Sequence, residues 1–579
     1  MLLAASNQTP PQKNLQKKAA TDSAAASALR ALTLRDRIAQ MIVVRGYGDY
    51  PAPDDEQYRR FGRWIREDHV GGFIVAGRIR NGNVLDANAF EMAAFINHVQ
   101  RMAHTPLLVA SDFERGAANR VGETASFPYM MAFGAAQDPA LTKELGAVTA
   151  KEARALGVNW VFAPDADVNN NPDNPIINVR SFGEDPRLVA QNVAAFIDGA
   201  HSDIRHYVLV TAKHFPGHGD TAQDSHMQLA RVDAPRERLE SLEFVPFRAA
   251  IEHGVDSIMT AHLAVPAIEP AGLPATLSRN VLTNVLRDDM NFKGLVVTDA
   301  MEMQGITSLF PEGEAAVRAV EAGADVLLMP INPDTVIKAI EAAVESGRIS
   351  RKRIDASVAK ILSAKQKVGL YRSRLVDLDE IPAEIKAKQA ADLAQRVADR
   401  SLTLLKDEKH LFPMPPGSGS CLVIMTERQF SSRGELLVYS LLRSQADVKT
   451  YFVNAGTPDS ELSAAATDIA QCKQVYVAAF VTVAANRGSV ALEGGLGTFL
   501  TDLVHASAPV ALISLGNPYL WRQFPDVAAY LATFSTSDSS EIATARALAG
   551  KVGISGKAPI SIPPLAKLGD GISVAMKQN

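Results

Sequence analysis

Residues that could do acid-base or nucleophilic chemistry follow short apolar runs in the first two thirds of the sequence. They cluster in five successive segments: Ser111 to Gly116, Pro164 to Val168, Lys213 to His226, His262 and Asp299. A single charged residue at a strand end is usually solvated or part of a structural ion pair. Because loops at the carboxyl ends of parallel strands share one face, the succession of segments indicates a common site.

Asp299 is the last residue of the apolar run GLVVTD. A strand that ends in a carboxylate holds it rigidly, and an ionised carboxylate within roughly 3 to 3.5 Å of its target suits a nucleophile. The alternative is an N-cap, because Asp is favoured there and a helix is expected to begin near Met301. The spacing alone favours neither interpretation.

Asp224 lies two residues before His226, in a stretch whose Gly217 and Gly219 predict a flexible loop. A carboxylate can orient an imidazole and stabilise its cation, and histidine exchanges protons near neutral pH. One alternative is a surface loop with incidental charge. A second is a zinc site, and the sequence leaves it open. Its candidate ligands are His214, His218 and His226 with Asp220 or Asp224.

Further polar residues near the same strand ends could bind a polyhydroxylated ligand through fixed donors and acceptors. They are Asp112, Arg120, Arg180, Lys213 and His214. The sequence lacks a GxxxxGK[ST] motif and a GxGxxG motif in a strand-to-helix setting, so a nucleotide enzyme is not indicated.

The elements that would position these residues alternate between short apolar runs and amphipathic stretches. Eight runs are strand candidates: Met41 to Val44, Gly72 to Val75, Leu107 to Ala110, Trp160 to Ala163, Tyr207 to Thr211, Ser257 to Ala261, Leu295 to Thr298 and Val326 to Met329. Helical patterns include Ala87 to His104, Ala140 to Leu156, Pro235 to His253 and Asp334 to Ser346. We therefore predict an α/β chain with a (β/α)8 TIM-type barrel over residues 31–370.

The pattern changes after residue 370. Residues 371–400 read as a linker that runs into a helix near Gln389 to Arg400, and residues 401–579 form a second, smaller domain. Its strand candidates are Cys421 to Met425, Thr450 to Val453, Val475 to Val481, Val510 to Leu515 and Ala529 to Phe534. About five strands in this part of the chain predict an open α/β/α sandwich. Residues 1–30 are expected to form a disordered N-terminal tail.

The composition of the chain limits the kinds of partner that it is expected to bind. The chain of 579 residues is 47% hydrophobic and 21% charged, with a net charge of -5. This balance gives no case for a nucleic acid or an anionic membrane surface, and no apolar run reaches the roughly 18 to 20 residues of a membrane span. Cys421 and Cys472 are too few for a disulfide scaffold, and the sequence alone does not say whether they are bonded. The first residues, Met1 to Ala5, could be the end of a signal peptide.

Two long motifs carry a family resemblance. KHFPGHGDTAQDSH (Lys213 to His226) and FAPDADVNNNPDNPIINVRSFGEDP (Phe162 to Pro186) resemble glycoside hydrolase family 3, specifically its bacterial β-N-acetylglucosaminidase (NagZ-type) branch. The similarity extends to LTLRDRIAQM, VVTDAMEM and SLTLLK elsewhere in the chain. One departure is Arg115, which stands where the family usually has Gly in an Asp-x-Glu-Gly-Gly run.

The resemblance implies a role for each candidate residue. Asp299 would be the nucleophile, and His226, oriented by Asp224, the general acid/base. The terminal N-acetylglucosamine would be held by Asp112, Arg180, Lys213 and His214, with Arg120 as a weaker addition. The family uses no metal, which argues against zinc, and we expect no cofactor.

The activity implied is retaining hydrolysis of non-reducing terminal β-N-acetylglucosamine from peptidoglycan-derived fragments, with phosphate able to compete with water. A location in the cell envelope, periplasm or outside the cell is expected, with the cytoplasm as the alternative. Rival interpretations are a family 3 β-glucosidase that uses Glu493 of LEGG, a metal-dependent hydrolase, and a carbohydrate-binding protein without catalysis. The sequence does not indicate the oligomeric state.

Overall fold

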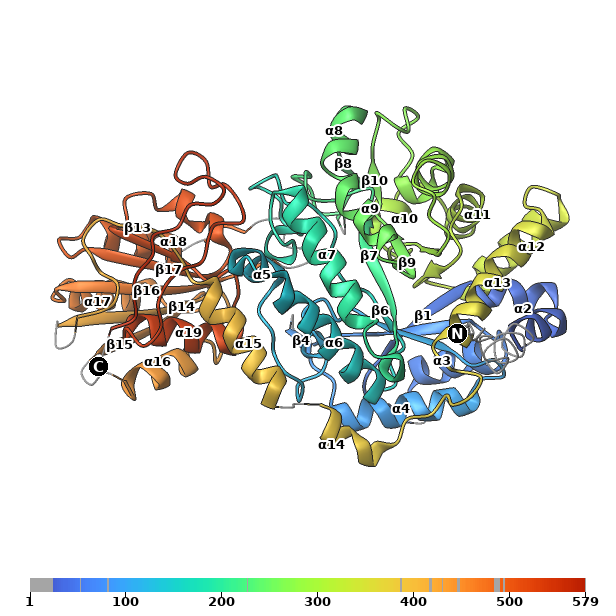
Figure 1. Ribbon diagram of the computed structural model, residues 1–579, viewed down its shortest axis with the longest axis horizontal. Helices are drawn as coiled ribbons and strands as arrows, with labels where there is room; N and C mark the ends of the chain where they lie inside the picture. The colour runs from blue at the N-terminus through green and yellow to red at the C-terminus, as the bar shows by residue number, and fades with distance from the viewer. Residues whose placement is uncertain are drawn as a thin grey trace, which may run out of the picture.

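The computed structural model describes residues 24–577 except 53, 81–82, 226, 386–387, 416–418, 430, 445–447, 484–489 and 493–494. His226 and Glu493 therefore lie outside the described residues. Figure 1 shows two sheets with their helices: one is coloured blue to yellow, and the other is orange and red.

Eight parallel strands form a barrel, as the sequence predicts. They are β1 (Ile42–Tyr47), β2 (Gly72–Ala76), β5 (Leu108–Ser111), β6 (Trp160–Val161), β7 (Leu209–Phe215), β9 (Ser257–Thr260), β11 (Leu295–Val297) and β12 (Leu327–Leu328). Each pairs with its neighbours in chain order, and β1 pairs with β12. Two hydrogen bonds close the ring between β11 and β12: Thr298 N to Val326 O and Val326 N to Val296 O, each 3.0 Å.

Helices surround this barrel. Their bounds are α2 (Leu34–Gln40), α3 (Glu56–Arg66), α4 (Ala89–Met102), α5 (Met130–Ala136), α6 (Pro139–Ala155), α7 (Pro186–Ala200), α8 (Arg236–Ser241), α9 (Phe244–Glu252), α10 (Gln304–Thr307), α11 (Glu312–Ala322), α12 (Pro333–Glu345) and α13 (Arg351–Lys367). The single helix predicted over Pro235 to His253 is wrong, because the helix breaks at Leu242 and Glu243. Pro246 explains the break, since proline fits only the first turn of a helix.

Asp or Asn followed by Pro starts several of these helices. Asp138 caps α6, Asp185 caps α7 and Asn332 caps α12, and each accepts a backbone N–H with its side chain. The following Pro loses no hydrogen bond, because the first N–H groups of a helix have no partner inside it. These caps fix the point at which each loop ends and its helix begins.

The second sheet has the order β13-β18-β17-β16-β14-β15. Its strands are β13 (Thr403–Asp407), β14 (Ser420–Thr426), β15 (Lys449–Asn454), β16 (Gln474–Val481), β17 (Val510–Gly516) and β18 (Ala529–Ala532). β14 to β18 are parallel in a doubly wound order, which confirms the predicted open α/β domain. The antiparallel edge strand β13 was not among the predicted strands. The flanking helices are α16 (Glu435–Leu442), α17 (Asp459–Ile469), α18 (Gly495–His505) and α19 (Asp538–Leu548).

Cys421 and Cys472 form a disulfide in this part of the chain, with Cα atoms 5.9 Å apart. It ties the beginning of β14 to the turn that precedes β16. The sequence alone left this pairing open.

Helices also form in the two segments that flank the barrel in the chain. Residues 24–31 are helical, so the tail predicted over 1–30 is wrong for residues 24–30; the earlier residues lie outside the described part. Ala25 N donates to Gln366 Oε1 on α13 at 3.2 Å. After the barrel come α14 (Ile381–Glu384) and α15 (Lys388–Ser401), the latter close to the predicted helix.

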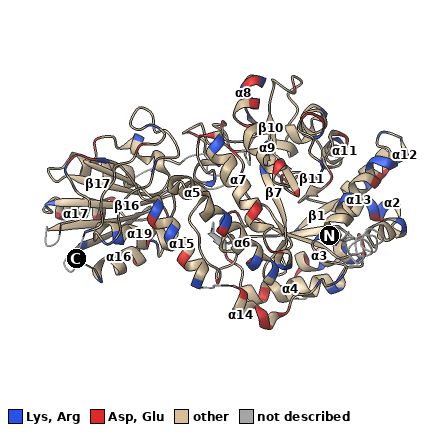
Figure 2. Ribbon diagram, viewed as in Figure 1, with Lys and Arg blue, Asp and Glu red and all other residues tan. Residues whose placement is uncertain are grey.

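Charges of both signs are spread over the outer helices, for example α8, α12 and α15 (Figure 2). None of the helices in the part of the chain that the structure describes combines the length and apolar character needed to cross a bilayer.

Lys365 on α13 is fully buried, with 0% of the residue exposed. Its ammonium donates to Gln40 Oε1 at 2.5 Å, and the Gln40 amide donates to His69 O at 2.7 Å. Burial lowers the pKa of Lys365 to about 7, because a neutral amide compensates little of the lost hydration. A lysine that is easily deprotonated is therefore buried between α13 and α2.

We predict that Lys365→Met raises the melting temperature more at pH 6 than at pH 9. Below about pH 7 the lysine is protonated in both the folded and unfolded states, so the folded state bears the full cost of a buried charge. Between pH 7 and 10 the unfolded state binds more protons, so wild-type stability rises with pH. At pH 6 the substitution should raise the free energy of unfolding by on the order of 3 kcal/mol. Thermal unfolding across this pH range measures the change. Lys338→Met, on the exposed face of α12, is the control. Equal gains at both pH values would contradict the prediction.

Candidate active site

Lys213 is at the centre of a buried ionic cluster at the carboxyl ends of β5, β6 and β7. Its Nζ lies 2.9 Å from Asp112 Oδ1, 2.7 Å from Glu114 Oε1 and 3.9 Å from Asp165 Oδ1. Only 2% of the Lys213 side chain is exposed. Since β7 extends to Phe215, Lys213 and His214 lie within the strand rather than after it, which holds both side chains rigidly.

Arg180 and Arg120 complete the cluster. Arg180 forms a two-point contact with Glu114, from Nε at 2.9 Å and Nη2 at 2.8 Å, and Nη2 lies 3.2 Å from Asp165. Arg120 donates to Asp112 Oδ2 at 3.1 Å. Three carboxylates thus face three cations. The structure brings together four of the predicted sugar-binding residues here: Asp112, Arg120, Arg180 and Lys213.

Electrostatics keeps most of this cluster charged. Burial works to raise the pKa of Glu114, but Arg180 and Lys213 outweigh it and hold that pKa well below its usual range. The pKa of Asp112 is also lowered, because Lys213 and Arg120 outweigh its burial. Asp165 differs: burial, reinforced by the negative charge of Glu114, raises its pKa to about 7 despite Arg180 and Lys213. Asp165 is therefore the member of the cluster that titrates near neutral pH.

His214 is oriented by Asp167. The ring Nδ1 lies 2.8 Å from Asp167 Oδ2, and the His214 backbone N–H donates to Asp167 Oδ1. Although burial works to lower it, the pKa of His214 is raised by the Asp167 charge. With Nδ1 directed at Asp167, Nε2 is the ring atom that can reach a ligand.

The loop that carries Asp224 is pinned rather than flexible, contrary to the prediction. His218 Nε2 lies 2.9 Å from Ser225 Oγ, and His218 Nδ1 lies 2.9 Å from Thr221 Oγ1. Asp167 accepts the backbone N–H of His218 at 2.6 Å. Gly219 is needed for close approach, because a Cβ atom there would lie 1.7 Å from Val168 O. Asp224 itself is buried, and His226 lies outside the described residues.

The predicted zinc ligands do not converge in the described part of the chain. Both ring nitrogens of His218 contact hydroxyls, and Asp220 pairs with Arg238 at 2.6 Å. A different set, Asp165, Asp167 and His214, does come within 4.8 Å. Arg180 and Lys213 next to Asp165 already supply positive charge, which disfavours a metal cation at that position.

Asp299 lies two residues beyond β11. Its backbone N–H donates to Thr260 O at 3.2 Å, and its Oδ1 accepts the Ala300 N–H at 2.7 Å. The next helix, α10, starts at Gln304 with Met303 as its N-cap, so interpreting Asp299 as a helix cap is wrong.

His262 holds the peptide that follows Asp299. Its Nε2 lies 3.0 Å from Ala300 O and its Nδ1 2.9 Å from Thr276 Oγ1. Both contacts are to structural groups, so His262 links the ends of β9 and β11.

The Asp224 loop packs against the segment that follows Asp299. A Cβ atom at Gly305, the second residue of α10, would lie 3.2 Å from Ser225 O and 3.1 Å from His262 Cβ. The Ser225 carbonyl is therefore close to α10, the helix that follows Asp299 in the chain.

Comparison with known proteins agrees with this architecture. The profile "Glycosyl hydrolase family 3 N terminal domain" matches residues 33–364. The chain belongs to glycoside hydrolase family 3. It is 30% identical over 532 residues to a Cellulomonas fimi protein named "Beta-N-acetylglucosaminidase/beta-glucosidase", covering 87% of this chain and 90% of the relative.

Two further relatives of this family 3 enzyme are informative. "Beta-hexosaminidase A" of Pseudoalteromonas piscicida is 34% identical over 330 residues, covering 52% of this chain and 54% of the relative. The structure of a family 3 β-N-acetylglucosaminidase from Paenibacillus sp. str. FPU-7 superposes with a TM-score of 0.81 at 34% identity, covering 92% of this chain and 99% of the other.

Sequence reasoning missed three buried members of the site in this family 3 enzyme: Glu114, Asp165 and Asp167. Each belongs to a segment singled out in the sequence, but spacing along the chain does not show which carboxylates turn inward. Arg115 turns away from the cluster: its guanidinium contacts Asn119 and lies 4.9 Å from the Tyr129 ring centroid. The unusual Arg therefore leaves the adjacent Glu114 in place.

We predict that Glu114→Gln destabilises the family 3 enzyme by on the order of 3 kcal/mol. The change leaves Arg180 and Lys213 largely buried with less compensating charge. Glu144→Gln is the matched control, because Glu144 pairs with Arg396 on the surface, where an ion pair contributes about 1 kcal/mol or less. Chemical denaturation at pH 7 measures both. Equal shifts in the two variants would show that the cluster is not held by Glu114.

Proposed function

We propose that this family 3 enzyme is a retaining exo-β-N-acetylglucosaminidase with Asp299 as nucleophile and His226, oriented by Asp224, as general acid/base. The observation that carries the proposal is the packing of the pinned Asp224 loop against the chain that leaves Asp299. The names of the relatives from Cellulomonas, Pseudoalteromonas and Paenibacillus support the same substrate class.

In the first step, an oxygen of Asp299 forms a bond to the anomeric carbon while the bond to the leaving oxygen breaks. The His226 imidazolium gives its proton to that oxygen. In the second step, water attacks the anomeric carbon of the glycosyl-aspartate, His226 takes a proton from it, and the bond to Asp299 breaks. Two inversions leave the β configuration retained.

The ionic cluster would hold the sugar hydroxyls. Because Glu114 keeps Lys213 and Arg180 charged and fixed, these cations can donate to hydroxyls without reorganising. Asp112 is 23% exposed at its side chain and is the carboxylate most able to accept a hydrogen bond from a sugar hydroxyl. His214 Nε2 and Arg120 would complete the set.

A histidine in place of a second carboxylate has an electrostatic consequence. After giving up its proton, the imidazole is neutral and does not repel an anionic acceptor that approaches the glycosyl-aspartate. Phosphate could therefore compete with water in the second step.

We assign the natural substrate to peptidoglycan-derived fragments in which N-acetylglucosamine is β-linked to a muramic-acid residue. The disulfide between Cys421 and Cys472 supports an oxidising location, in the cell envelope or outside the cell, since such bonds persist there.

A family 3 β-glucosidase is the second candidate, because the name of the Cellulomonas relative includes both activities. Its acid/base would come from the second domain, with Glu493 as the candidate. Glu493 lies outside the described residues, so the choice between the two activities depends on substrate preference.

We predict that the enzyme cleaves an aryl N-acetyl-β-glucosaminide with a kcat/KM at least about 100-fold higher than the matching β-glucoside, because the Asp224 to His226 loop is typical of the hexosaminidase branch. Steady-state kinetics on the paired substrates measures the ratio. Asp299→Asn is the negative control, since an amide keeps the shape of the carboxylate but is a poor nucleophile. A ratio below one would exclude the proposal and favour Glu493 as the acid/base.

We predict that His226→Ala loses far more activity on substrates with poor leaving groups than on activated aryl glycosides. A general acid contributes roughly 100-fold to 10,000-fold where the leaving oxygen needs a proton and little where it does not. The measurement is kcat/KM against leaving-group pKa, with and without a chelator. Asp224→Ala should show the same trend more weakly. His253→Ala, which breaks a surface pair with Asp198, is the control. A slope for His226→Ala no steeper than wild type would remove His226 from the role.

A further inference from the structure

The loop that carries Arg180 is bonded to the second domain on both sides of that residue. It runs from residue 169 to residue 185, between β6 and α7, and its only regular structure is a 3₁₀ turn at Asn178–Arg180. Four of its side chains contact the second domain or the C-terminal segment: Asn169, Asp173, Asn178 and Glu184. A loop of this length needs such support to hold a side chain accurately.

The two innermost contacts are fully buried. Asn169 Nδ2 donates to Tyr519 Oη at 3.0 Å, and Asn178 Nδ2 donates to Asn517 Oδ1 at 3.1 Å. Tyr519 is 5% exposed, Asn517 is 2% exposed, and both barrel asparagines are 0% exposed. Hydrogen bonds are stronger in such surroundings, and loss of one partner leaves a buried polar group unpaired.

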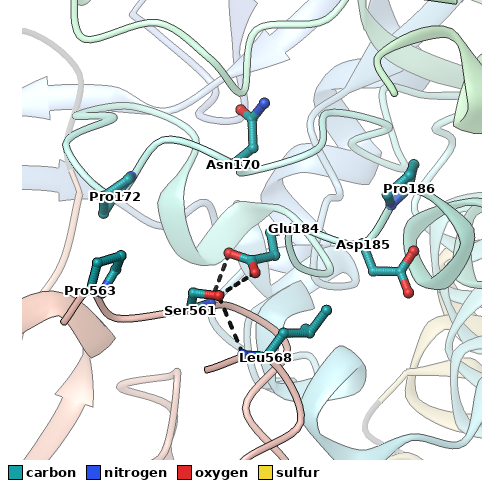
Figure 3. A pocket seen from close by; sticks show the side chains of 8 residues that line it. All are labelled: Asn170, Pro172, Glu184, Asp185, Pro186, Ser561, Pro563 and Leu568. Carbon is teal, nitrogen blue, oxygen red and sulfur yellow. Dashed lines mark hydrogen bonds between the residues drawn. The ribbon is translucent and has the colours of Figure 1, made fainter. Parts of the chain in front are cut away.

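The two outer contacts, at Asp173 and Glu184, are less buried than the inner two. Asp173 and Arg522 form an ion pair at 2.6 Å with side chains 66% and 37% exposed. Glu184 accepts from Ser561 N at 2.7 Å and from Ser561 Oγ at 2.5 Å. These bonds lie beside a pocket of about 520 Å³ between this loop and the C-terminal segment (Figure 3). The exposed Asp173–Arg522 pair contributes little, so the loop is held by the buried contacts of Asn169 and Asn178 and by the part-buried contact of Glu184.

The contacts that hold Asn178 also restrain Arg180, which lies two residues further along the chain. Asn169 Oδ1 accepts the backbone N–H of Asn178 at 2.8 Å, so both asparagines belong to one network. Asn178 has a φ of 42°, a left-handed conformation that few residues other than glycine adopt readily. Arg180 N then donates to Ile177 O at 2.8 Å and its Nη1 to Ile176 O at 3.1 Å.

The second domain holds its own partners rigidly. The Asn517 backbone N–H donates to Val481 O at 2.7 Å, and its Nδ2 donates to Val490 O at 2.9 Å. Ser514 Oγ donates to Asn517 O at 2.6 Å. Asn517 is therefore held at the carboxyl ends of β16 and β17.

We propose that Tyr519 and Asn517 are positioning residues, through which the second domain fixes Arg180 against Glu114 for sugar binding. The assignment rests on the proposed function in that Arg180 must contact the substrate. It gives the second domain a role in the barrel's reaction without placing one of its side chains on the reacting atoms.

Tyr519→Phe tests this role, because it deletes only the hydroxyl that faces the barrel. We expect kcat/KM on an aryl N-acetyl-β-glucosaminide to fall roughly 5-fold, mainly through KM, as expected for one buried hydrogen bond. Tyr476→Phe is the matched control: its buried hydroxyl donates to Leu411 O at 2.7 Å, inside the second domain. Equal kinetics in the two variants would overturn the proposal.

A double-mutant cycle separates positioning from general destabilisation. In an Arg180→Ala background, Tyr519→Phe should change KM by less than about 2-fold, since the residue it positions is gone. A full additive loss would refute action through Arg180. Asn178→Gly, which tolerates the left-handed backbone but removes the amide, should reproduce the effect of Tyr519→Phe.

Hydrogen exchange gives a readout that does not require turnover. Backbone amides of residues 174–183 should exchange faster in Tyr519→Phe than in Tyr476→Phe, and unchanged exchange would contradict the proposal. A wild type inactive on N-acetylglucosaminides would refute the proposed function alone, while the exchange result would still decide whether Tyr519 fixes the loop.

Discussion

The candidate active site depends on the interaction between buried Lys213 and the carboxylate of Glu114. Bringing an ammonium to 2% exposure is costly, and the cost is offset only because three carboxylates surround it. Arg180 and Arg120 then balance those carboxylates. Removing one member therefore affects the pKa values and positions of the others, and the site must assemble as a unit. The strand β7 carries Lys213, so the position of the cluster follows from the barrel.

The alternation of apolar runs was sufficient to predict the eight barrel strands and the open second sheet. Parallel strands buried on both faces leave a strong local signal. The edge strand β13 was missed, because Thr403–Asp407 follows α15 almost directly, without a turn signal. The break between α8 and α9 was missed for a similar reason: the helical period continues through Pro246, and only the rule for proline in a first turn shows where a new helix starts.

The candidate residues were chosen from their positions after strands, and these positions did not show which residues they would contact. Lys213 and Asp112 are separated by 101 residues, and Arg180 and Glu114 by 66, so no local pattern records their contact. The glycines near His218 illustrate a second limit. They were interpreted as a source of flexibility, whereas Gly219 is required because backbone from the preceding loop occupies the space of a Cβ atom. A glycine in sequence does not distinguish freedom from tight packing.

The second domain illustrates how a doubly wound sheet can serve a neighbouring site. Ligands usually bind at the carboxyl edge of such a sheet. Here the strands β16 and β17 end in Val481 and Gly516, and Gly516, with a φ of 115°, lets the chain turn so that Asn517 reaches the barrel. A Cβ atom at Gly516 would lie 2.1 Å from Val481 O, so another residue would displace this turn. The edge that elsewhere holds a ligand therefore holds the loop of Arg180, and the barrel supplies the charged groups while the second sheet restrains their movement.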